Sequence, residues 1–328
     1  MMDSAGLATA LPAVLEPVLG QAPRIENLRA LTGGASRLTW AFDAVTGTDR
    51  QALILRTGAA EDTNAGMELE ARVQRAAAEA GAPVPRVLVA DDAADLLGSP
   101  FLICAAIEGE TIVRRIQRRL DDAGRSRLLD QCAHALACIH RSRTDDPALH
   151  SDDPLDPWRR RLDETGDTTA TFEWAFRWLE RHRPTPTSGD AEVLVHGDFR
   201  MGNLIVDDDG LAAVLDWELV HRGQRYDDLS WFCVRAWRFG APADLGAGGL
   251  GSIEDFLRAY ERAADRAVDR RVFRWWLVLA TLRWGIICRL QAERHLSGQS
   301  RSVELATIGR RVCENEWDLL DLIGDTTR

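Results

Sequence analysis

Lysine is absent from this 328-residue chain, and all forty of its basic residues are arginines. Apart from seven histidines, every cationic side chain that a site could use is therefore a guanidinium. A guanidinium is planar and binds carboxylates and phosphates through two nitrogens at once, whereas an ammonium acts as a point charge. Any anion-binding site in this protein must be built with that geometry.

Cys-x-x-Cys pairs are absent as well. The six cysteines are scattered through the chain, at Cys104, Cys132, Cys138, Cys233, Cys288 and Cys313. This distribution favours neither a zinc site nor a disulfide framework. The N-terminal residues lack the basic and apolar segments of a signal sequence. We therefore expect a cytoplasmic protein.

Long apolar runs, repeats and an excess of positive charge are also missing. The run from Trp275 to Leu282 is followed by Arg283 and is too short for a membrane span. The formal net charge of −11 disfavours nonspecific binding to nucleic acid. One arginine cluster, Arg114 to Arg119, is either a solvent-exposed helix face or a dock for an anionic substrate such as a coenzyme A phosphate. We favour the first, and expect neither membrane nor nucleic-acid partners.

Three polar residues in the second half of the chain have a spacing that indicates a functional site. Asp198 and Asn203 lie in the segment His-Gly-Asp-Phe-Arg-Met-Gly-Asn, which follows a predicted strand at 192–195. Asp216 ends the apolar run 211–215, which also reads as a strand. Residues 203–206 would form the returning strand, and Asp207 to Gly210 its hairpin turn.

These residue types suit phosphoryl transfer. An ionised Asp198 can orient and deprotonate a hydroxyl within hydrogen-bond reach. Asn203 and Asp216 offer oxygen ligands, which Mg²⁺ prefers. Metal ions and positioned charges carry most of the catalysis in this chemistry. A zinc hydrolase built from His196, Asp198 and Asp216 is the alternative, but no further histidine stands at ligand spacing.

The chain resembles the aminoglycoside phosphotransferase-like superfamily, relatives of the protein kinases. Within it, the chain is most similar to the bacterial branch related to the kinase-like domain attached to some acyl-CoA dehydrogenases. The resemblance spans about Ile25 to Leu322 and is carried by His196 to Asn203, Val214 to Glu218, Asp228-Leu229-Ser230-Trp231 and Ile308 to Leu320. It implies ATP or GTP with Mg²⁺, and transfer of the γ-phosphate to a hydroxyl of a small molecule.

The resemblance also implies an α+β, two-lobed protein kinase-like fold. Residues 1–107 would form a small antiparallel-sheet lobe with one main helix, and residues 108–328 a larger, mostly helical lobe. The strand from Pro100 to Ile107 would end the first lobe as a hinge, and the backbone of Cys104, Ala105, Ala106 and Ile107 would hold the nucleotide base.

Three strands are predicted in the first lobe, at 24–32, 37–44 and 50–56. Gly33, Gly34 and Ser36 lie between the first two, where glycine lets backbone amides approach phosphate oxygens closely. A simple hairpin turn is the alternative. Arg56 would take the position of the lysine that kinases place on the third strand, with Glu70 on a predicted helix at 67–80 as its partner. Otherwise the two are a surface strand-end charge and a solvated helix residue.

Further roles follow from position. Arg200, two residues after Asp198, would either neutralise the transferring phosphoryl group or pair with an acidic side chain and brace the loop. Glu218 would either touch the metal through water or contact the substrate, or only support the residues that bind the metal, and we favour the last. Amphipathic helices are predicted at 123–143, 169–183, 253–267, 272–294 and 303–322. Phe239 to Ser252 would be a mobile glycine-rich loop, and 184–189 a polar linker.

The acceptor, the choice between ATP and GTP, and the oligomeric state stay open. Tryptophans gather in the C-terminal helices, at Trp231, Trp237, Trp275, Trp276 and Trp284, and most should be core residues. If some line the cleft, a hydroxyacyl thioester or a macrolide is favoured; excess acidic residues would instead suit an aminoglycoside. Intact Asp198, Asn203 and Asp216 indicate an active enzyme. The absence of lysine favours the alternative, a nucleotide-binding pseudokinase that regulates a partner.

Overall fold

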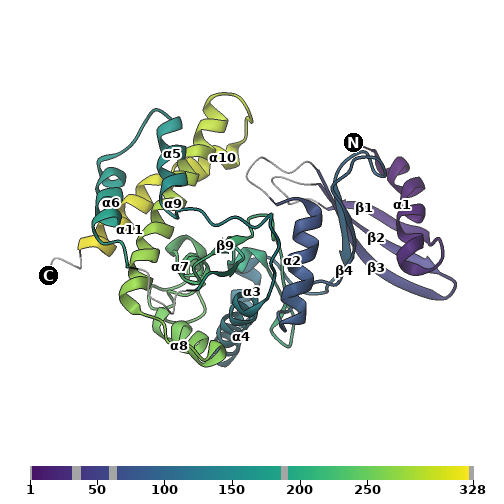
Figure 1. The fold of residues 1–328 in the computed structure, drawn as a ribbon, viewed down its shortest axis with the longest axis horizontal. Helices are drawn as coiled ribbons and strands as arrows, with labels where there is room; N and C mark the ends of the chain where they lie inside the picture. The colour runs from purple at the N-terminus through teal and green to yellow at the C-terminus, as the bar shows by residue number, and fades with distance from the viewer. Residues whose placement is uncertain (1, 32–37, 59–64, 186–190, 325–328) are drawn as a thin grey trace.

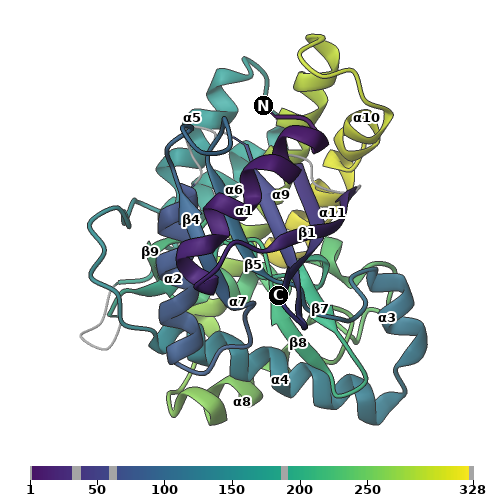
Figure 2. The ribbon, with the colours of Figure 1, turned by 90° about the vertical axis from the view of Figure 1, so that its right-hand side faces the viewer.

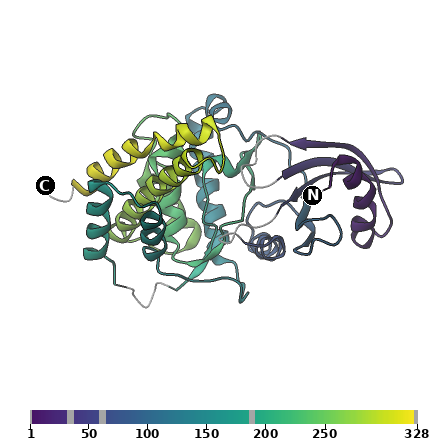
Figure 3. The ribbon, with the colours of Figure 1, turned by 90° about the horizontal axis from the view of Figure 1, so that it is seen from above.

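The chain folds into a small sheet lobe and a larger helical lobe that lie end to end (Figures 1 and 3). The computed structural model describes residues 2–31, 38–58, 65–185 and 191–324. This arrangement confirms the predicted α+β, protein kinase-like fold.

The sheet lobe is built on five antiparallel strands. They are β1 (Arg24–Leu31), β2 (Leu38–Thr46), β3 (Asp49–Thr57), β4 (Val87–Asp91) and β5 (Phe101–Ala105), in the order β1-β2-β3-β5-β4. The first three lie within a few residues of the predicted strands. β5 lies between β3 and β4 and is buried along most of its length, because its side chains alternate between two covered faces.

Two helices, not the single predicted one, cover these faces. Phe101 and Ile103 of β5 belong to the same apolar cluster as α1 (Ser4–Leu19), whereas Leu102 and Cys104 pack with α2 (Met67–Glu79). Figure 2 shows α1 lying across the sheet. The sequence analysis predicted no helix before the first strand, so the lobe has a second helical layer that it missed.

Capping and burial explain why α1 forms despite prolines at positions 12 and 17. The Asp3 side chain accepts a hydrogen bond from the Gly6 N–H at 2.8 Å, which satisfies one free donor at the helix start. Gly20 ends the helix in the left-handed conformation, with φ of 76°. Leu7, Leu11, Val14 and Leu15 bury one face against the sheet.

The helical lobe contains the remaining helices of the described chain. They are α3 (Val113–Arg119), α4 (Asp122–Arg141), α5 (Asp156–Glu164), α6 (Ala170–Arg181), α7 (Tyr226–Phe232), α8 (Ile253–Ala264), α9 (Arg270–Leu296), α10 (Val303–Gly309) and α11 (Val312–Gly324). In α3, Val113 and Ile116 are buried and the four arginines are exposed. The prediction of a solvent-exposed helix face is confirmed there.

Two short antiparallel strand pairs flank the predicted catalytic segment. β7 (Leu204–Val206) pairs with β8 (Leu211–Val214), as predicted. β6 (Val193–Val195) pairs with β9 (His221–Gly223), which the sequence analysis did not predict. β7 therefore pairs with β8 and not with β6, the strand that precedes it in the chain.

One prediction about the C-terminal half was wrong. The single helix expected at 303–322 is broken into α10 and α11, where Gly309 lies so close to α9 that an added Cβ would be 2.5 Å from the Ala292 side chain. In the glycine-rich segment 239–252, Ala247 and Leu250 are buried, and its mobility stays a prediction. Most of the predicted linker at 184–189 lies outside the described residues.

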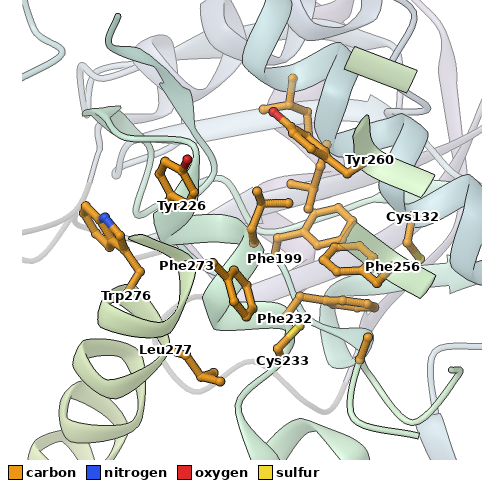
Figure 4. Packing of buried hydrophobic residues seen from close by; sticks show 14 of the residues in the cluster. Cys132, Phe199, Tyr226, Phe232, Cys233, Phe256, Tyr260, Phe273, Trp276 and Leu277 are labelled. Carbon is orange, nitrogen blue, oxygen red and sulfur yellow. The ribbon is translucent and has the colours of Figure 1, made fainter. Parts of the chain in front are cut away.

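An aromatic core lies directly beneath the predicted catalytic loop (Figure 4). Phe199 packs on Phe232 with ring centroids 5.5 Å apart, and Phe232 packs on Phe256 at 4.9 Å. All three side chains are fully buried. The backbone next to Asp198 is thereby fixed to α7 and α8. No helix among the described residues is both long and apolar enough to cross a membrane.

Candidate active site

The loop that carries Asp198 begins where β6 ends and depends on a glycine. Gly197 has a φ of 83°, and a Cβ at this position would be 2.4 Å from the Leu219 carbonyl oxygen. Only glycine adopts this left-handed conformation in so little space without strain. The loop then turns through a short 3-10 segment, Met201–Asn203, before β7 begins.

Asp198 is held by three neighbouring side chains. The Arg200 Nε–H lies 3.0 Å from Oδ1 and 3.1 Å from Oδ2. Asn203 donates from Nδ2 to Oδ2 at 2.7 Å. Trp231 donates from its indole Nε1 to Oδ1 at 2.7 Å. The carboxylate is therefore fixed in orientation, and the structure brings the predicted Asp198, Arg200 and Asn203 together.

A buried carboxylate, Asp228, anchors the backbone of the loop from α7. Its oxygens accept hydrogen bonds from the N–H groups of His196 at 2.8 Å and Gly197 at 2.9 Å. It also lies 3.1 Å from Nε2 of His140, whose Nδ1 lies 2.8 Å from the Tyr260 hydroxyl. Burial alone would raise the pKa of Asp228, but these hydrogen bonds and the neighbouring histidines lower it overall.

His196 serves the loop as a neutral side chain. It is completely buried, and burial lowers its pKa despite the nearby carboxylates. Its Nε2 lies 3.1 Å from the Leu215 carbonyl oxygen, and its Nδ1 accepts the N–H of Asp198 at 3.2 Å. The residue thus links the loop of Asp198 to the strand end that precedes Asp216.

Asn203 and Asp216 flank the ends of one strand pair. Leu204 of β7 is paired with Val214 of β8, and the Leu215 N–H donates to the Asn203 carbonyl at 2.8 Å. Asn203 directs its Nδ2 to the backbone and side chain of Asp198, which leaves its Oδ1 without a donor in the described part of the chain. Oδ2 of Asp216 likewise receives no donor from the residues described. Two hard oxygen atoms therefore remain available at this edge, a set that fits Mg²⁺.

Asp216 has an unusual backbone conformation, with φ of 69°. A non-glycine residue with positive φ costs conformational energy and is common at functional sites. The residue lies two positions after the end of β8, and its carboxylate accepts a hydrogen bond from Arg56 of β3.

Arg56 joins the two lobes at this carboxylate. Its Nη1 donates to Glu70 of α2 at 2.9 Å, and its Nη2 donates to Asp216 at 2.9 Å. Glu70 is completely buried, so the alternative of a solvated helix residue is wrong. Burial opposes the charge on Arg56, but the carboxylates of Glu70, Asp216 and Glu218 outweigh it and raise the pKa of the guanidinium.

Tryptophan is the residue type whose contribution the sequence analysis underestimated. Four of the five tryptophans singled out there are buried, as predicted, and Trp284 is partly buried. Trp231, however, also contacts Asp198. It forms a cluster with Trp237, at 5.2 Å between ring centroids, and Trp284 packs on Trp237 at 4.6 Å. In the sequence, the only indication of this role was that Trp231 belongs to the segment 228–231, which carries part of the family resemblance.

Two backbone N–H groups of the predicted hinge already donate hydrogen bonds within the sheet lobe. The Ala105 N–H donates to the Arg86 carbonyl and the Ala106 N–H to the Ala52 carbonyl, each at 2.9 Å. Among described residues, the Ile107 N–H has no acceptor. Burial raises the pKa of the Cys104 thiol to about 11, although Arg56 opposes this, so the side chain stays uncharged.

Gly33, Gly34 and Ser36, the predicted phosphate-binding residues, lie outside the described residues. Within the described part of the chain, no group of three or more histidine, cysteine, aspartate or glutamate side chains could hold a metal ion. Asn203 and Asp216 are a ligand pair of a different type, because Mg²⁺ in proteins often keeps several waters and is held by one or two protein oxygens together with substrate phosphates.

Comparison with known proteins identifies relatives with this architecture. The chain is 26% identical over 296 residues to mouse acyl-CoA dehydrogenase family member 10, a match that covers 82% of this chain and 27% of that protein. The chain thus spans about a quarter of the length of this relative and of two other curated relatives that it matches. Curated relatives of this kind carry the kinase-like domain that the sequence analysis named.

Two solved structures share the fold. One is a Ralstonia eutropha protein provisionally named as an aminoglycoside phosphotransferase, with a TM-score of 0.79, 21% identity and coverage of 95% of this chain and 98% of that one. The other is a spectinomycin phosphotransferase in complex with ADP and spectinomycin, with a TM-score of 0.66, 15% identity and coverage of 94% and 97%. A family model described as the phosphotransferase enzyme family matches residues 27–276. The chain belongs to the phosphotransferase enzyme family.

Proposed function

We propose that the protein transfers the γ-phosphate of ATP or GTP, with Mg²⁺, to a hydroxyl group of a small molecule. The observation that carries this proposal is that Asn203, next to one end of the β7–β8 pair, contacts Asp198, while Asp216, beyond the paired end of β8, contacts Arg56 from the sheet lobe. Solved relatives of the same fold hold ADP or AMP-PNP, which supports a nucleotide as the donor.

Asp198 is the proposed base. It would accept the proton of the acceptor hydroxyl as the hydroxyl oxygen bonds to the γ-phosphorus, while the bond from that phosphorus to the β–γ bridging oxygen breaks. Its side chain is 15% exposed, which leaves it accessible from one side. Asn203 keeps the carboxylate oriented through the 2.7 Å hydrogen bond to Oδ2.

Asn203 and Asp216 are the proposed metal ligands. Their unused oxygens would bind Mg²⁺, which would neutralise charge on the nucleotide phosphates during transfer. Arg56 bonds to Oδ1 of Asp216 and leaves Oδ2 open, so ion pair and metal ligation are compatible on one carboxylate. Arg56 would also contact the nucleotide phosphates, in the role that kinases assign to lysine.

Nucleotide binding is proposed to involve the hinge and the glycine-rich turn. Because Ala105 and Ala106 use their N–H groups within the sheet lobe, the Ile107 N–H is the remaining donor for the base, with the carbonyl groups of Cys104 to Ile107 as candidate acceptors. Gly33, Gly34 and Ser36 would enclose the phosphates. On this basis we propose the lobe boundary between residues 107 and 108.

Arg200 is a proposed contact of the transferring phosphoryl group. Its Nε–H is engaged with Asp198, and its guanidinium lies over the Trp237 ring with the carbon 5.0 Å from the centroid. Its two terminal nitrogens have no acceptor among the described residues. A short swing would carry them to a phosphate, and the aromatic surface would support the guanidinium in either position.

A phosphorylation screen tests the proposal. The protein is incubated with Mg·ATP or Mg·GTP and a panel of hydroxylated metabolites and antibiotics, and mass spectrometry detects acceptors that gain one phosphate. We expect at least one acceptor to be modified, modification to stop in Asp198→Asn, and normal modification in the matched control Asp208→Asn, whose carboxylate lies in an exposed turn. Equal modification by Asp198→Asn and wild type would refute the assigned base. If the protein binds the nucleotide but neither phosphorylates any acceptor nor hydrolyses the nucleotide, the pseudokinase alternative is favoured.

A further inference from the structure

Trp231 lies at the boundary between the core of α7 and the candidate active site. Its side chain is 2% exposed, yet its indole N–H reaches the Asp198 carboxylate at 2.7 Å. We infer that Trp231 is a positioning residue, which fixes the rotation of the Asp198 carboxylate for proton transfer from the acceptor. This inference rests on the proposed phosphotransferase function.

Burial separates Trp231 from Arg200 as a partner of Asp198. An indole N–H is only a donor, and Trp231 is 2% exposed, so its ring has little room to leave the carboxylate. Arg200 is the mobile partner, because its guanidinium has a second attractive position at a phosphate. Once Arg200 leaves, Trp231 still occupies Oδ1 and Asn203 still occupies Oδ2. Each oxygen then keeps a lone pair that can face the acceptor hydroxyl.

A buried guanidinium prevents Trp231 from turning away. The central carbon of Arg283 lies 4.3 Å from the centroid of the Trp231 ring and 5.1 Å from that of Trp158. The same guanidinium donates to the Gly197 carbonyl at 2.7 Å and to Asp227 at 3.0 Å. Arg283 therefore ties the indole ring to the backbone immediately before Asp198, and the distance between ring and loop is fixed by α9.

The consequence is a carboxylate with little rotational freedom. Proton transfer needs the accepting oxygen within about 3 Å of the hydroxyl and in line with it, and small displacements of a reacting group are costly. Loss of the indole N–H would free Oδ1 on the side opposite to Asn203. The carboxylate could then rotate towards Arg200, whose Nε already lies within 3.1 Å of both oxygens.

The contact itself can be measured without any enzymatic activity. In protein labelled with nitrogen-15 at the indoles, the signal of the Trp231 N–H is identified by its loss in Trp231→Phe. We expect this signal to lie downfield, as a donor to a carboxylate should, and to move upfield in Asp198→Asn. The same signal should stay in place in Asp208→Asn. If the chemical shift of the Trp231 N–H is the same in Asp198→Asn as in wild type, the inference is wrong.

The kinetic role is measured as the hydrolysis of Mg·ATP by the full chain. Trp231→Phe keeps an aromatic ring on Arg283 but removes the donor, and we expect kcat to fall about tenfold or more, with KM for ATP changed less than about twofold. The matched control is Trp275→Phe, which removes a buried indole donor on α9 from the Leu179 carbonyl of α6, 2.8 Å away. It should lower thermal stability and leave kcat unchanged.

Two results separate this inference from the function on which it rests. If Trp231→Phe hydrolyses ATP within twofold of wild type, the positioning role is refuted and the phosphotransferase proposal stands. If the indole signal responds to Asp198→Asn but wild-type protein neither binds nor turns over Mg·ATP or Mg·GTP, the phosphotransferase proposal is refuted, and the catalytic purpose of the contact falls with it.

Discussion

At the scale of single residues, Arg56 makes the absence of lysine workable. Its two terminal nitrogens bond separately to Glu70 and to Asp216, each at 2.9 Å. The planar fork of a guanidinium holds its donors at a fixed spread, so one residue can join carboxylates from two lobes. A lysine ammonium in this place would have to share a single nitrogen between them.

Removing Arg56 tests this ion pair through stability. Arg56→Ala leaves the buried Glu70 carboxylate without its guanidinium, and we expect the free energy of unfolding in urea to fall by about 3 kcal/mol. Adding Glu70→Gln should restore part of the loss, because the buried negative charge is then gone. Arg24→Ala, at an exposed ion pair with Glu26 on β1, is the control and should change stability by no more than about 0.5 kcal/mol. Equal losses in the single and double variants would contradict the account.

At the scale of elements, the short helix α7 organises the active-site loop. In one and a half to two turns it supplies Asp227 to Arg283, Asp228 to the loop backbone and Trp231 to Asp198. Residues three and four apart lie on one face of a helix, which is why Asp228 and Trp231 both reach the loop. The helix gains its own rigidity from the burial of Leu229 and Phe232 in the core.

Asp228→Asn tests the anchoring role of this helix. The amide keeps the size of the side chain but replaces one acceptor oxygen with a donor, which would face the N–H groups of His196 or Gly197. We expect a loss of about 3 kcal/mol in the free energy of unfolding, measured in urea. Asp244→Asn removes an exposed carboxylate and should be neutral. An Asp228→Asn protein as stable as wild type would rule out an anchoring role.

Elements whose sequence pattern is local could be predicted, whereas elements that depend on contacts with distant parts of the chain could not. β1 to β3 follow from apolar and β-branched runs bounded by turn residues, and the hairpin of β7 and β8 from its Asp-Asp-Asp-Gly turn. The helix α1 was not predicted; Pro12 and Pro17 disfavour a helix locally, whereas its caps and its burial on the sheet stabilise it. The break between α10 and α11 depends on contact with α9, which no local pattern indicates.

At the scale of the whole molecule, the site is assembled from contacts across long stretches of chain. Arg56 meets Asp216 across 160 residues, a contact that was not predicted from the sequence, where Glu70 was the only partner named for Arg56. Asp198 and Asn203 were identified from their spacing and lie together as expected. Trp231 could not be found in this way, because a tryptophan on a helix is usually a core residue and its N–H partner depends on how α7 and α9 pack.

The two-lobed arrangement carries the central claim, that Asp216 holds the metal of a bound nucleotide while Asp198 acts only on the acceptor. Arg56 and Glu70 belong to the sheet lobe, and Asp216 and Asp198 to the helical lobe. A nucleotide bound between them should stabilise the folded chain, by about 2.7 kcal/mol at a concentration of one hundred times Kd.

The most direct test is the shift in Tm caused by Mg·ATP and by Mg·GTP in three proteins. The account predicts a clear shift for wild type, a shift of similar size for Asp198→Ala, and none for Asp216→Ala; chelation of Mg²⁺ should abolish the shift in all of them. A shift that survives in Asp216→Ala, or no shift with either nucleotide in wild type, would contradict the account.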